Sequence, residues 1–583
     1  MPGFFVCNRK LNMELKEYVV NDYINNKVEI DVNDQEILVL RKTINRFLDD
    51  KTCVETNNYI LIQEGYLVNK EYLLDKYKKQ DINSLLITMY ETNGETFFEE
   101  FRGSFSGALY DKKNDLWLVF TNQIGDNPIF YYKDNNKYAF GSQVQYILEY
   151  CKKECIQLKF NESCAYQLLT YGFVANNETF AKEIQRLGAG DYLLIKNGKL
   201  EVKSYHKFVK NKERFKNRSE KEIINELDRS FRDAVSLEWE KDTEYGLKHL
   251  ADLSGGLDSR MNYWVAHELG YCNPLVLTYS KYGYLDETIA EDIANKWKDE
   301  MIFKPLDDAL YLSDVDENTS LLAGLSLYSG ITGGKRLLES LKLNQYGVEH
   351  TGMIGDVIIG TFLSSSQDNQ RHQPTGMYSH KLKDRVSECI ANWSDNFFDH
   401  EIYLIYTRGF HGACNTHLLR RNYIEVGSPF LNVDFIQLCL DIPIELRLDH
   451  NIYKKWIIQK YPEAANFKWE KTGGKITEGK FIGILRKLIT RGPNKLKRLL
   501  GKDYLIKSGM NPLDYWLANN RSLQKYLDIY ERENYLYIPN YVSSQLTKDM
   551  KTLYDTGTVN EKTMVLTVLA AAKLYFGDIN EEV

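Results

Sequence analysis

The sequence of 583 residues lacks the features of secreted and membrane-spanning proteins. Its nine cysteines form no Cys-x-x-Cys pair and no dense framework, which predicts reduced, buried thiols and favours a cytoplasmic location. No apolar run approaches the roughly 18 to 20 residues that span a bilayer, and no early segment has the length or flanks of a signal peptide. The longest apolar stretch, Met564 to Ala572, predicts a buried helix.

An excess of basic residues is also missing. The chain has 74 Lys and Arg against 81 Asp and Glu, a formal charge of −7, whereas a nucleic-acid-binding surface needs a positive excess. We therefore expect no nucleic-acid partner. The length allows several domains with large buried cores.

A Walker A phosphate loop is absent, because the nearest candidate, residues 330–336, has the wrong spacing and no hydroxyl after its lysine. A different pattern runs from Ser254 to Ser259, where an apolar segment, Ser-Gly-Gly and about three helical turns predict strand, turn and helix. Backbone N–H groups at such a turn and at the helix N-terminus bind phosphate. Asp258 would repel that phosphate unless a cation intervened, so we interpret it as a Mg²⁺ ligand. A surface turn with an incidental aspartate is the alternative for these six residues alone.

The run Ser-Gly-Gly-Leu-Asp-Ser resembles the pyrophosphate loop of the ATP pyrophosphatases, and in this variant that of the asparagine synthetases. The resemblance implies ATP bound with Mg²⁺. The residues implied to contact ATP in this loop are Leu253, Ser254, Gly255, Gly256, Asp258 and Ser259.

A second strand at residues 273–280 and an amphipathic helix through Trp297 continue the strand–helix alternation. This alternation predicts a parallel sheet with right-handed crossovers. Ligands in such sheets bind at the carboxyl ends of strands, so Thr278 is expected to contact the nucleotide.

Residues 350–362 resemble the family motif Ser-Gly-x-Gly-x-Asp-Glu-Leu-Phe-Gly-Gly-Tyr. The resemblance implies that Thr351 and Gly352 contact ATP and that Asp356 is the second Mg²⁺ ligand. Met353 stands where asparagine synthetases carry Glu and β-lactam-forming relatives carry Tyr, and Val357 replaces another Glu. Proton transfer must therefore come from another group, or the amine must arrive neutral.

Two further segments resemble catalytic parts of the family. Residues 423–432 are similar to Ser-Leu-Glu-Ala-Arg-x-Pro-Phe-Leu-Asp, which implies a catalytic role for Glu425 near the acceptor pocket. Residues 470–474 resemble the loop that supplies a lysine to the phosphates, which implies that role for Lys471. The family's proline is missing there, and the neighbouring alternatives are Lys454, Lys455 and Lys475.

The first 150 residues predict short strands at residues 59–62, 106–110, 116–121 and 129–132, separated by turn signals. Residues 101–111 and 122–132 resemble the class II glutamine amidotransferase domain of asparagine synthetases. The glutaminase chemistry is nevertheless missing, since that family exposes a cysteine as its first residue. Here Pro2 follows Met1, Cys7 lies inside the chain, and Tyr66 replaces the carboxylate that grips glutamine.

The resulting fold class combines α/β and α+β parts. We predict a degenerate Ntn-type amidotransferase sandwich at residues 1–209, a linker at 210–219, a parallel-sheet ATP pyrophosphatase domain at 220–480 and a helical extension at 481–583. The basic residues that begin the extension predict a solvated helix face. A carrier protein or anionic surface bound there, and a homodimer, are additional partner hypotheses.

We interpret the chain as a ligase that adenylates a substrate carboxylate with ATP and transfers the acyl group to an amine. Because glutamine hydrolysis in cis is lost, the resemblance points to the β-lactam synthetases and lasso-peptide cyclases, with a small-molecule or peptide carboxylate as substrate. Three alternatives remain. They are asparagine synthase-type amidation, an inactive scaffold, and a serine peptidase suggested by the triplets beginning at Ser204, Ser394 and Lys471.

Overall fold

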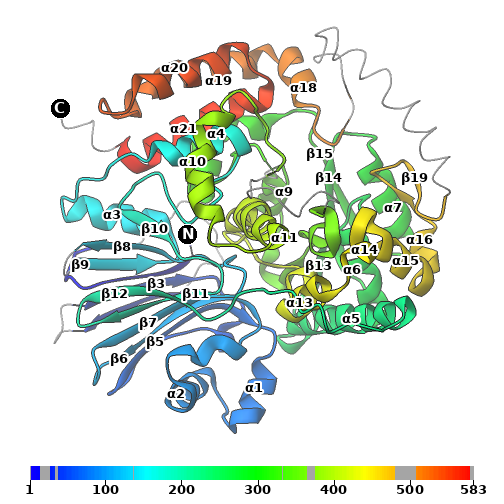
Figure 1. Cartoon of the computed structure of the whole chain (residues 1–583), viewed down its shortest axis with the longest axis horizontal. Helices are drawn as coiled ribbons and strands as arrows, with labels where there is room; N and C mark the ends of the chain where they lie inside the picture. Colours follow the sequence, from blue (N-terminus) through cyan, green and yellow to red (C-terminus); the bar gives the residue numbers. More distant parts are fainter. Residues whose placement is uncertain are drawn as a thin grey trace.

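The computed structural model describes residues 2–13, 26–32, 37–134, 137–330, 333–363, 375–478, 507 and 509–577. Its N-terminal part is a sandwich of two six-stranded antiparallel sheets, seen at the lower left of Figure 1. The first sheet has the order β10 (Ile184–Arg186), β8 (Phe130–Asp134), β9 (Lys137–Gly141), β1 (Gly3–Cys7), β3 (Ile37–Thr43) and β2 (Asn26–Val32). The second has β12 (Lys199–Ser204), β11 (Asp191–Lys196), β7 (Leu116–Thr121), β6 (Gly103–Asp111), β5 (Tyr59–Leu67) and β4 (Thr52–Glu55).

Alternating side chains build the sandwich core. Phe4 and Val6 of β1 face Ile60 and Ile62 of β5 through one buried cluster, as the period of two in a strand requires. Helices α1 (Lys70–Tyr77) and α2 (Ile82–Asn93) cover the outer face of the second sheet. Helices α3 (Val144–Lys153) and α4 (Glu162–Tyr171) lie on the side of the first sheet. The predicted sandwich and its four predicted strands are confirmed.

The second part contains a five-stranded parallel sheet of order β15 (Met301–Pro305), β14 (Leu275–Ser280), β13 (Lys248–Asp252), β16 (Tyr346–His350) and β17 (Glu425–Gly427). Helices α5 (Glu220–Glu244), α6 (Leu257–Glu268) and α7 (Leu285–Trp297) pack around it. The chain runs from β13 outward to β15 and then returns to β16. The point where the strand order reverses therefore lies between β13 and β16, where ligands bind in open parallel sheets. The predicted parallel sheet is confirmed.

Short helices connect and flank this sheet. They are α8 (Val315–Leu321), α9 (Lys335–Ser340), α10 (Lys383–Ser394), α11 (His400–Leu404), α12 (His417–Arg420), α13 (Val433–Asp441), α14 (Ile444–Arg447), α15 (Asn451–Lys460) and α16 (Pro462–Ala465). Two π-helical segments are η5 (Val357–Thr361) and η7 (Ile405–Ala413). Single 3₁₀ segments are η1 (Leu48–Asp50), η2 (Gly94–Glu100), η3 (Leu310–Ser313), η4 (Leu343–Gln345), η8 (Cys414–Thr416), η9 (Pro429–Leu431), η10 (Leu448–His450) and η12 (Tyr535–Tyr537). A small hairpin is made by β18 (Lys468–Trp469) and β19 (Gly474–Lys475).

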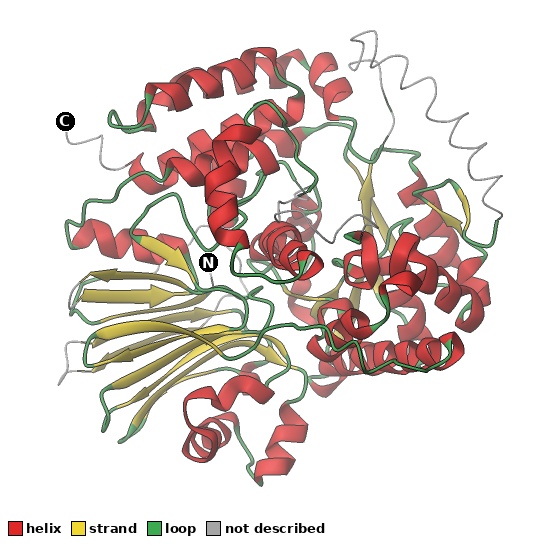
Figure 2. Cartoon of the chain, in the orientation of Figure 1, coloured by secondary structure: helices red, strands yellow, loops and turns green. Residues whose placement is uncertain are grey.

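The C-terminal helices form a layer across both parts, as Figure 2 shows at the top. They are α18 (Leu513–Asn519), α19 (Arg521–Asn534), α20 (Ser544–Thr556) and α21 (Val559–Phe576). Helix α21 packs on α8 of the second part and on α4 of the first, which buries the apolar stretch around Met564. The C-terminal helices therefore pack against both parts of the chain. The basic segment between Lys480 and Arg498 lies outside the described residues.

No helix in the described part of the chain combines the length and apolar character needed to cross a membrane.

Candidate active site

A cavity of about 360 Å³ lies at the carboxyl ends of β13, β14 and β16. This volume is within the range of small-molecule sites. Eight of the predicted ATP-contacting residues line it, namely Leu253, Ser254, Gly256, Asp258, Ser259, Thr278, Thr351 and Gly352. The structure thus brings together three segments that are up to a hundred residues apart in the sequence.

The backbone amides of the turn between β13 and α6 donate to side-chain oxygens of the protein itself. The Gly255 N–H donates to Asp286 Oδ1 (2.7 Å), the Ser254 N–H donates to Ser259 Oγ (3.1 Å), and the Gly256 N–H donates to Ser254 Oγ (3.2 Å). Gly255 therefore lies behind the cavity wall, and its amide already binds a carboxylate oxygen. Burial raises the pKa of Asp286 to about 6. A phosphate bound at this turn would therefore replace side-chain oxygens as the acceptor of these amides.

The two predicted metal ligands are neighbours in space. The Asp356 N–H donates to Asp258 Oδ2 (2.8 Å), and Tyr453 OH donates to Asp258 Oδ1 (2.8 Å). A Cβ on Gly352 would overlap the backbone of Ser259, so only glycine permits this approach of the β16 loop to α6. The close backbone contact fixes where Asp356 lies.

The carboxylates of Asp258 and Asp356 place two acidic groups close together. Burial and the nearby Asp356 carboxylate raise the pKa of Asp258 to about 8. Two carboxylates that oppose each other's ionisation form a favourable oxygen donor set for a hard cation. The residues present therefore fit Mg²⁺, with Asp258 and Asp356 as the ligands.

A chain of two hydrogen bonds, through Thr361 and His450, orients the Asp356 carboxylate. Its Oδ2 accepts from Thr361 Oγ1 (2.7 Å) at the end of η5. Thr361 has one hydroxyl proton, so His450 Nε2, 2.6 Å away, must donate to it. Burial lowers the pKa of His450, which keeps the ring neutral. Neither Thr361 nor His450 was indicated by the sequence.

Lys471 lies at the tip of the β18–β19 hairpin beside this carboxylate pair. Its ammonium is 5.5 Å from the Trp469 ring centroid, and its charge opposes the rise in the pKa of Asp258 and adds to the fall in the pKa of His450. Arg260 of α6 is buried and donates to Gly255 O (3.2 Å), Ala464 O (3.1 Å) and Lys468 O. Arg260 thereby joins the turn to the hairpin that carries Lys471.

The structure does not bring Glu425 to this cavity. Glu425 begins β17, and its Oε1 pairs with Lys51 Nζ of the N-terminal part (2.7 Å). The alternation of side chains along β17 directs Glu425 toward the sandwich. A catalytic role for Glu425 stays a prediction that this geometry does not support.

Two further residues of the site, Arg420 and Asp286, were not indicated by the sequence. Arg420 lines the cavity and pairs with Asp252 Oδ2 (3.0 Å) and with Glu349. The three residues come from α12, β13 and β16, so no local pattern could have indicated them. Asp286 was detectable in principle, because it follows the strand next to β13.

The N-terminal part has a cavity of only about 40 Å³ near Pro2 and Glu64. Glu64 pairs with Arg41 and accepts from Thr43 Oγ1 (2.8 Å). Cys7 is buried in β1, and burial raises the pKa of its thiol to about 12. A thiol with so little thiolate character is not a nucleophile at neutral pH.

A serine peptidase would require the motifs that begin at Ser204, Ser394 and Lys471 to lie together at one site. Ser204 Oγ contacts Gly190 O (3.4 Å) and Ser394 Oγ contacts Ala391 O (2.8 Å), while Lys471 lies by the Asp258 carboxylate. Both hydroxyls therefore bond to backbone carbonyls, and the contacts of Lys471 are at a different site.

Comparison with known proteins gives partial matches. Residues 53–206 match a glutamine amidotransferase domain family. A protein named asparagine synthetase (glutamine-hydrolyzing) 2 of Methanocaldococcus jannaschii is 26% identical over 36% of this chain and 41% of its own length. Asparagine synthetase B of Escherichia coli is 23% identical over 35% of this chain and 32% of its own length. Asparagine synthetase 1 of M. jannaschii is 22% identical over 68% of this chain and 64% of its own length.

The first two matched segments thus span less than half of these relatives. A glutamine phosphoribosylpyrophosphate amidotransferase from Bacillus subtilis, solved with ADP and GMP, has 9% identity and a TM-score of 0.23, covering 52% of this chain and 84% of that one. Together the sequence matches support a distant relationship of this chain to the asparagine synthetases.

Proposed function

We propose that this protein is an ATP-dependent carbon–nitrogen ligase that forms an amide by adenylating a carboxylate. The observation that carries the proposal is the contact between Asp258 and Asp356 beside the Ser254–Gly256 turn, at the reversal point of a parallel sheet. The partial similarity to asparagine synthetases supports it.

In this proposal the substrate carboxylate attacks the α-phosphorus of ATP, and pyrophosphate leaves toward the Ser254–Gly256 turn and the N-terminus of α6. Asp258 and Asp356 would hold Mg²⁺, which neutralises phosphate charge when bound. Lys471 would add positive charge as the transition state forms. An amine then displaces AMP from the acyl group.

The N-terminal part supports the loss of glutamine hydrolysis. Glu64 pairs with Arg41 within this part, Lys51 pairs with Glu425 of β17, and Cys7 is a buried strand residue. We therefore propose that the amine comes from another molecule or from the substrate itself, as in β-lactam synthetases and lasso-peptide cyclases. Amidation with free ammonia is the second candidate.

The decisive experiment incubates the protein with ATP and pooled carboxylic acids, grouped as amino acids, sugar acids and peptides. AMP and pyrophosphate are expected in one pool, and an ¹⁸O label in the active carboxylate should appear in AMP. Production of ADP and phosphate would contradict adenylation. The absence of any ATP turnover across the pools would favour the scaffold alternative.

A further inference from the structure

A large cavity that the proposed reaction does not use lies between the start of β11, the connection that follows β12, and the segments α10, α11 and η7. Its volume is about 610 Å³, which is within the range of small-molecule sites. Among the described residues, none lines both this cavity and the cavity that contains Asp258. The large cavity is therefore a separate place in the fold.

Five aromatic side chains line it, and we call it the aromatic cavity. They are Phe208, Trp393, Phe397, Phe398 and Tyr406. The ring centroid of Phe397 lies 5.3 Å from that of Tyr406 and 5.7 Å from that of Trp393. Phe398 is fully exposed, so a bound ligand would cover a ring that now faces solvent. Ring surfaces in this arrangement favour a planar apolar ligand.

Three residues on the wall of the aromatic cavity each have a buried polar atom with no hydrogen-bond partner among the described residues. The atoms are Nε1 of Trp393 in α10, Nδ1 of His411 in η7 and Oδ1 of Asn177 in the loop before β10. Leaving such an atom unpaired costs about 1 to 3 kcal/mol, so unpaired buried atoms are rare in folded proteins. Three of them around one cavity indicate a site that is complete only when a ligand or water is bound.

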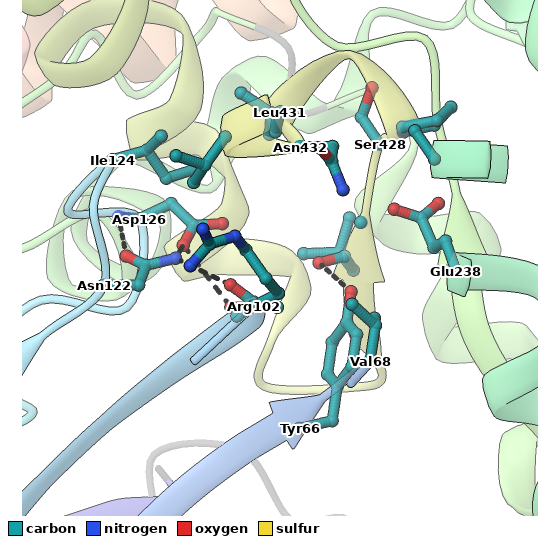
Figure 3. Close-up of a pocket in the computed structure, with 17 residues that line it drawn as sticks. Tyr66, Val68, Arg102, Asn122, Ile124, Asp126, Glu238, Ser428, Leu431 and Asn432 are labelled. Atoms are coloured by element: carbon teal, nitrogen blue, oxygen red, sulfur yellow. Dashed lines mark hydrogen bonds between the residues drawn. The ribbon is translucent and has the colours of Figure 1, made fainter. Parts of the chain in front are cut away.

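The small cavity in Figure 3 shows the opposite arrangement. It measures about 40 Å³, and its wall atoms bond to one another: Tyr66 OH donates to Val426 O (3.5 Å) and Asn122 Nδ2 donates to Asp126 Oδ1 (2.6 Å). None of its described lining residues has a buried, unpaired side-chain polar atom. A closed cavity of this kind needs no ligand, whereas the aromatic cavity has both space and unused hydrogen-bonding groups.

The unpaired atoms determine which groups a ligand must carry. An indole N–H only donates, so Trp393 requires an acceptor, whereas Asn177 Oδ1 requires a donor. His411 is 4% exposed, and burial, together with the charge of Arg186, lowers the pKa of its ring. The ring is therefore neutral, and its Nδ1 either donates or accepts.

The charged residues of the wall favour a neutral ligand. Two lysines and two aspartates line the aromatic cavity, namely Lys207, Lys210, Asp191 and Asp399, so their formal charges cancel. Lys210 Nζ pairs with Asp399 Oδ2 (2.8 Å). Burial raises the pKa of Asp191, while a hydrogen bond with Ser204 and the charge of Lys207 oppose that rise. A charged ligand would lose water without gaining a new counter-ion.

Segment η7 contacts both the aromatic cavity and the loop of the proposed metal site. Tyr406 and His411 of η7 line the cavity, and a Cβ placed on Gly409 of the same segment would lie 3.8 Å from Ile354 Cδ1. Ile354 lies between Thr351 and Asp356 in the chain. A ligand in the aromatic cavity would therefore be a neighbour of that loop without occupying the place of the nucleotide.

We infer that the aromatic cavity binds a small neutral aromatic molecule that carries a hydrogen-bond acceptor and a donor beside its ring, as an aryl amide does. The acceptor would receive the Trp393 N–H, and the donor would reach Asn177 Oδ1. The ring would lie among Phe208, Phe397 and Tyr406. This inference is independent of the proposed ligase function.

Saturation-transfer NMR on the full chain without ATP tests the site, with naphthamide as the probe. Naphthamide should bind. Methylnaphthalene should bind at least tenfold more weakly, because it leaves Trp393 and Asn177 unpaired. Naphthoate should also bind at least tenfold more weakly, because Lys210 is already paired. Equal affinities would overturn the inference, as would the absence of naphthamide binding, which would show that water satisfies the wall.

Variants locate the probe in the cavity. Trp393→Phe keeps a ring and removes the N–H, so the Kd for naphthamide should rise by about a factor of ten. Trp297→Phe is the matched control, because Trp297 in α7 also has a buried indole nitrogen without a partner among the described residues but does not line this cavity. Its Kd should stay within twofold of wild type. An equal change in both variants would reject the site.

Two further measurements do not depend on changes in the core. Phe398→Ser alters an exposed side chain, so the fold is retained, and the Kd for naphthamide should rise at least threefold. ATP with Mg²⁺ should leave the Kd of wild type within twofold, because no described residue lines both cavities. An unchanged Kd in Phe398→Ser, or displacement of naphthamide by ATP, would contradict binding in the aromatic cavity.

Discussion

The cavity that contains Asp258 and the small cavity near Glu64 both contain buried carboxylates, but their charges are balanced differently. In the N-terminal cavity each acid has a basic partner from the protein, Arg41 for Glu64 and Lys51 for Glu425. At the carboxyl ends of β13, β14 and β16, Asp258 accepts hydrogen bonds from the Asp356 amide and from Tyr453 OH, and the Asp356 carboxylate opposes its ionisation. An internally neutral pocket suits a structural role, whereas an unbalanced one calls for a cation and its ligand.

The Asp258→Asn variant gives the strongest test of this difference between the two cavities. Pyrophosphate release should fall at least 10³-fold, equivalent to about 4 kcal/mol, because the variant removes a metal ligand. The melting temperature should stay at the wild-type value, since the amide retains the shape and removes a buried charge. Turnover above a tenth of wild type would show that Asp258 does not bind the nucleotide's cation.

In the cavity near Glu64, removing one partner of an ion pair should instead lower the free energy of unfolding. Glu425→Gln leaves the buried Lys51 ammonium without its counter-charge, so we expect a loss of about 3 kcal/mol in the free energy of unfolding. Urea denaturation measures it. The exposed pair of Lys78 and Asp75 is the control, and Asp75→Asn should cost less than about 1 kcal/mol. A small effect at Glu425 would contradict the structural role of the pair.

Alkaline pH should destabilise the fold through its buried thiols. Burial raises the pKa of Cys7, Cys53 and Cys151 to about 12 from an ordinary value of 9.0. The unfolded chain loses these protons first, so stability is complete below pH 9 and falls as the pH rises from 9 toward 12. At pH 10 each thiol should cost about 1.4 kcal/mol. A Cys53→Ala variant should show a shallower decline than wild type, and an unchanged slope would contradict the assignment.

The smallest expected effect is on activity at Cys7. Cys7→Ala should leave pyrophosphate release within about twofold of wild type, because the thiol lies in a strand and is not exposed. In the native protein, alkylation should reach the exposed Cys155 and Cys272 first. A strong loss of activity in the Cys7 variant would restore a glutaminase role for the N-terminal part.

Local sequence patterns predicted much of this architecture. Short apolar segments separated by turn signals predicted four of the sandwich strands, and the strand–turn–helix signal placed Asp258 at the start of α6. The turn glycines and the two aspartates were also readable, because each belongs to a short motif with its own chemistry.

The sequence alone determined four sandwich strands, the turn from Ser254 to Ser259 and the helix that follows it, since these depend on neighbours within a few positions. Tertiary structure decided which motifs share a cavity. Arg260 reaches the hairpin of Lys471, Lys51 captures Glu425, and Glu238 meets His350 across 112 positions. Such pairings depend on the approach of separate elements, and their energies depend on burial, so a linear pattern carries no signal for them.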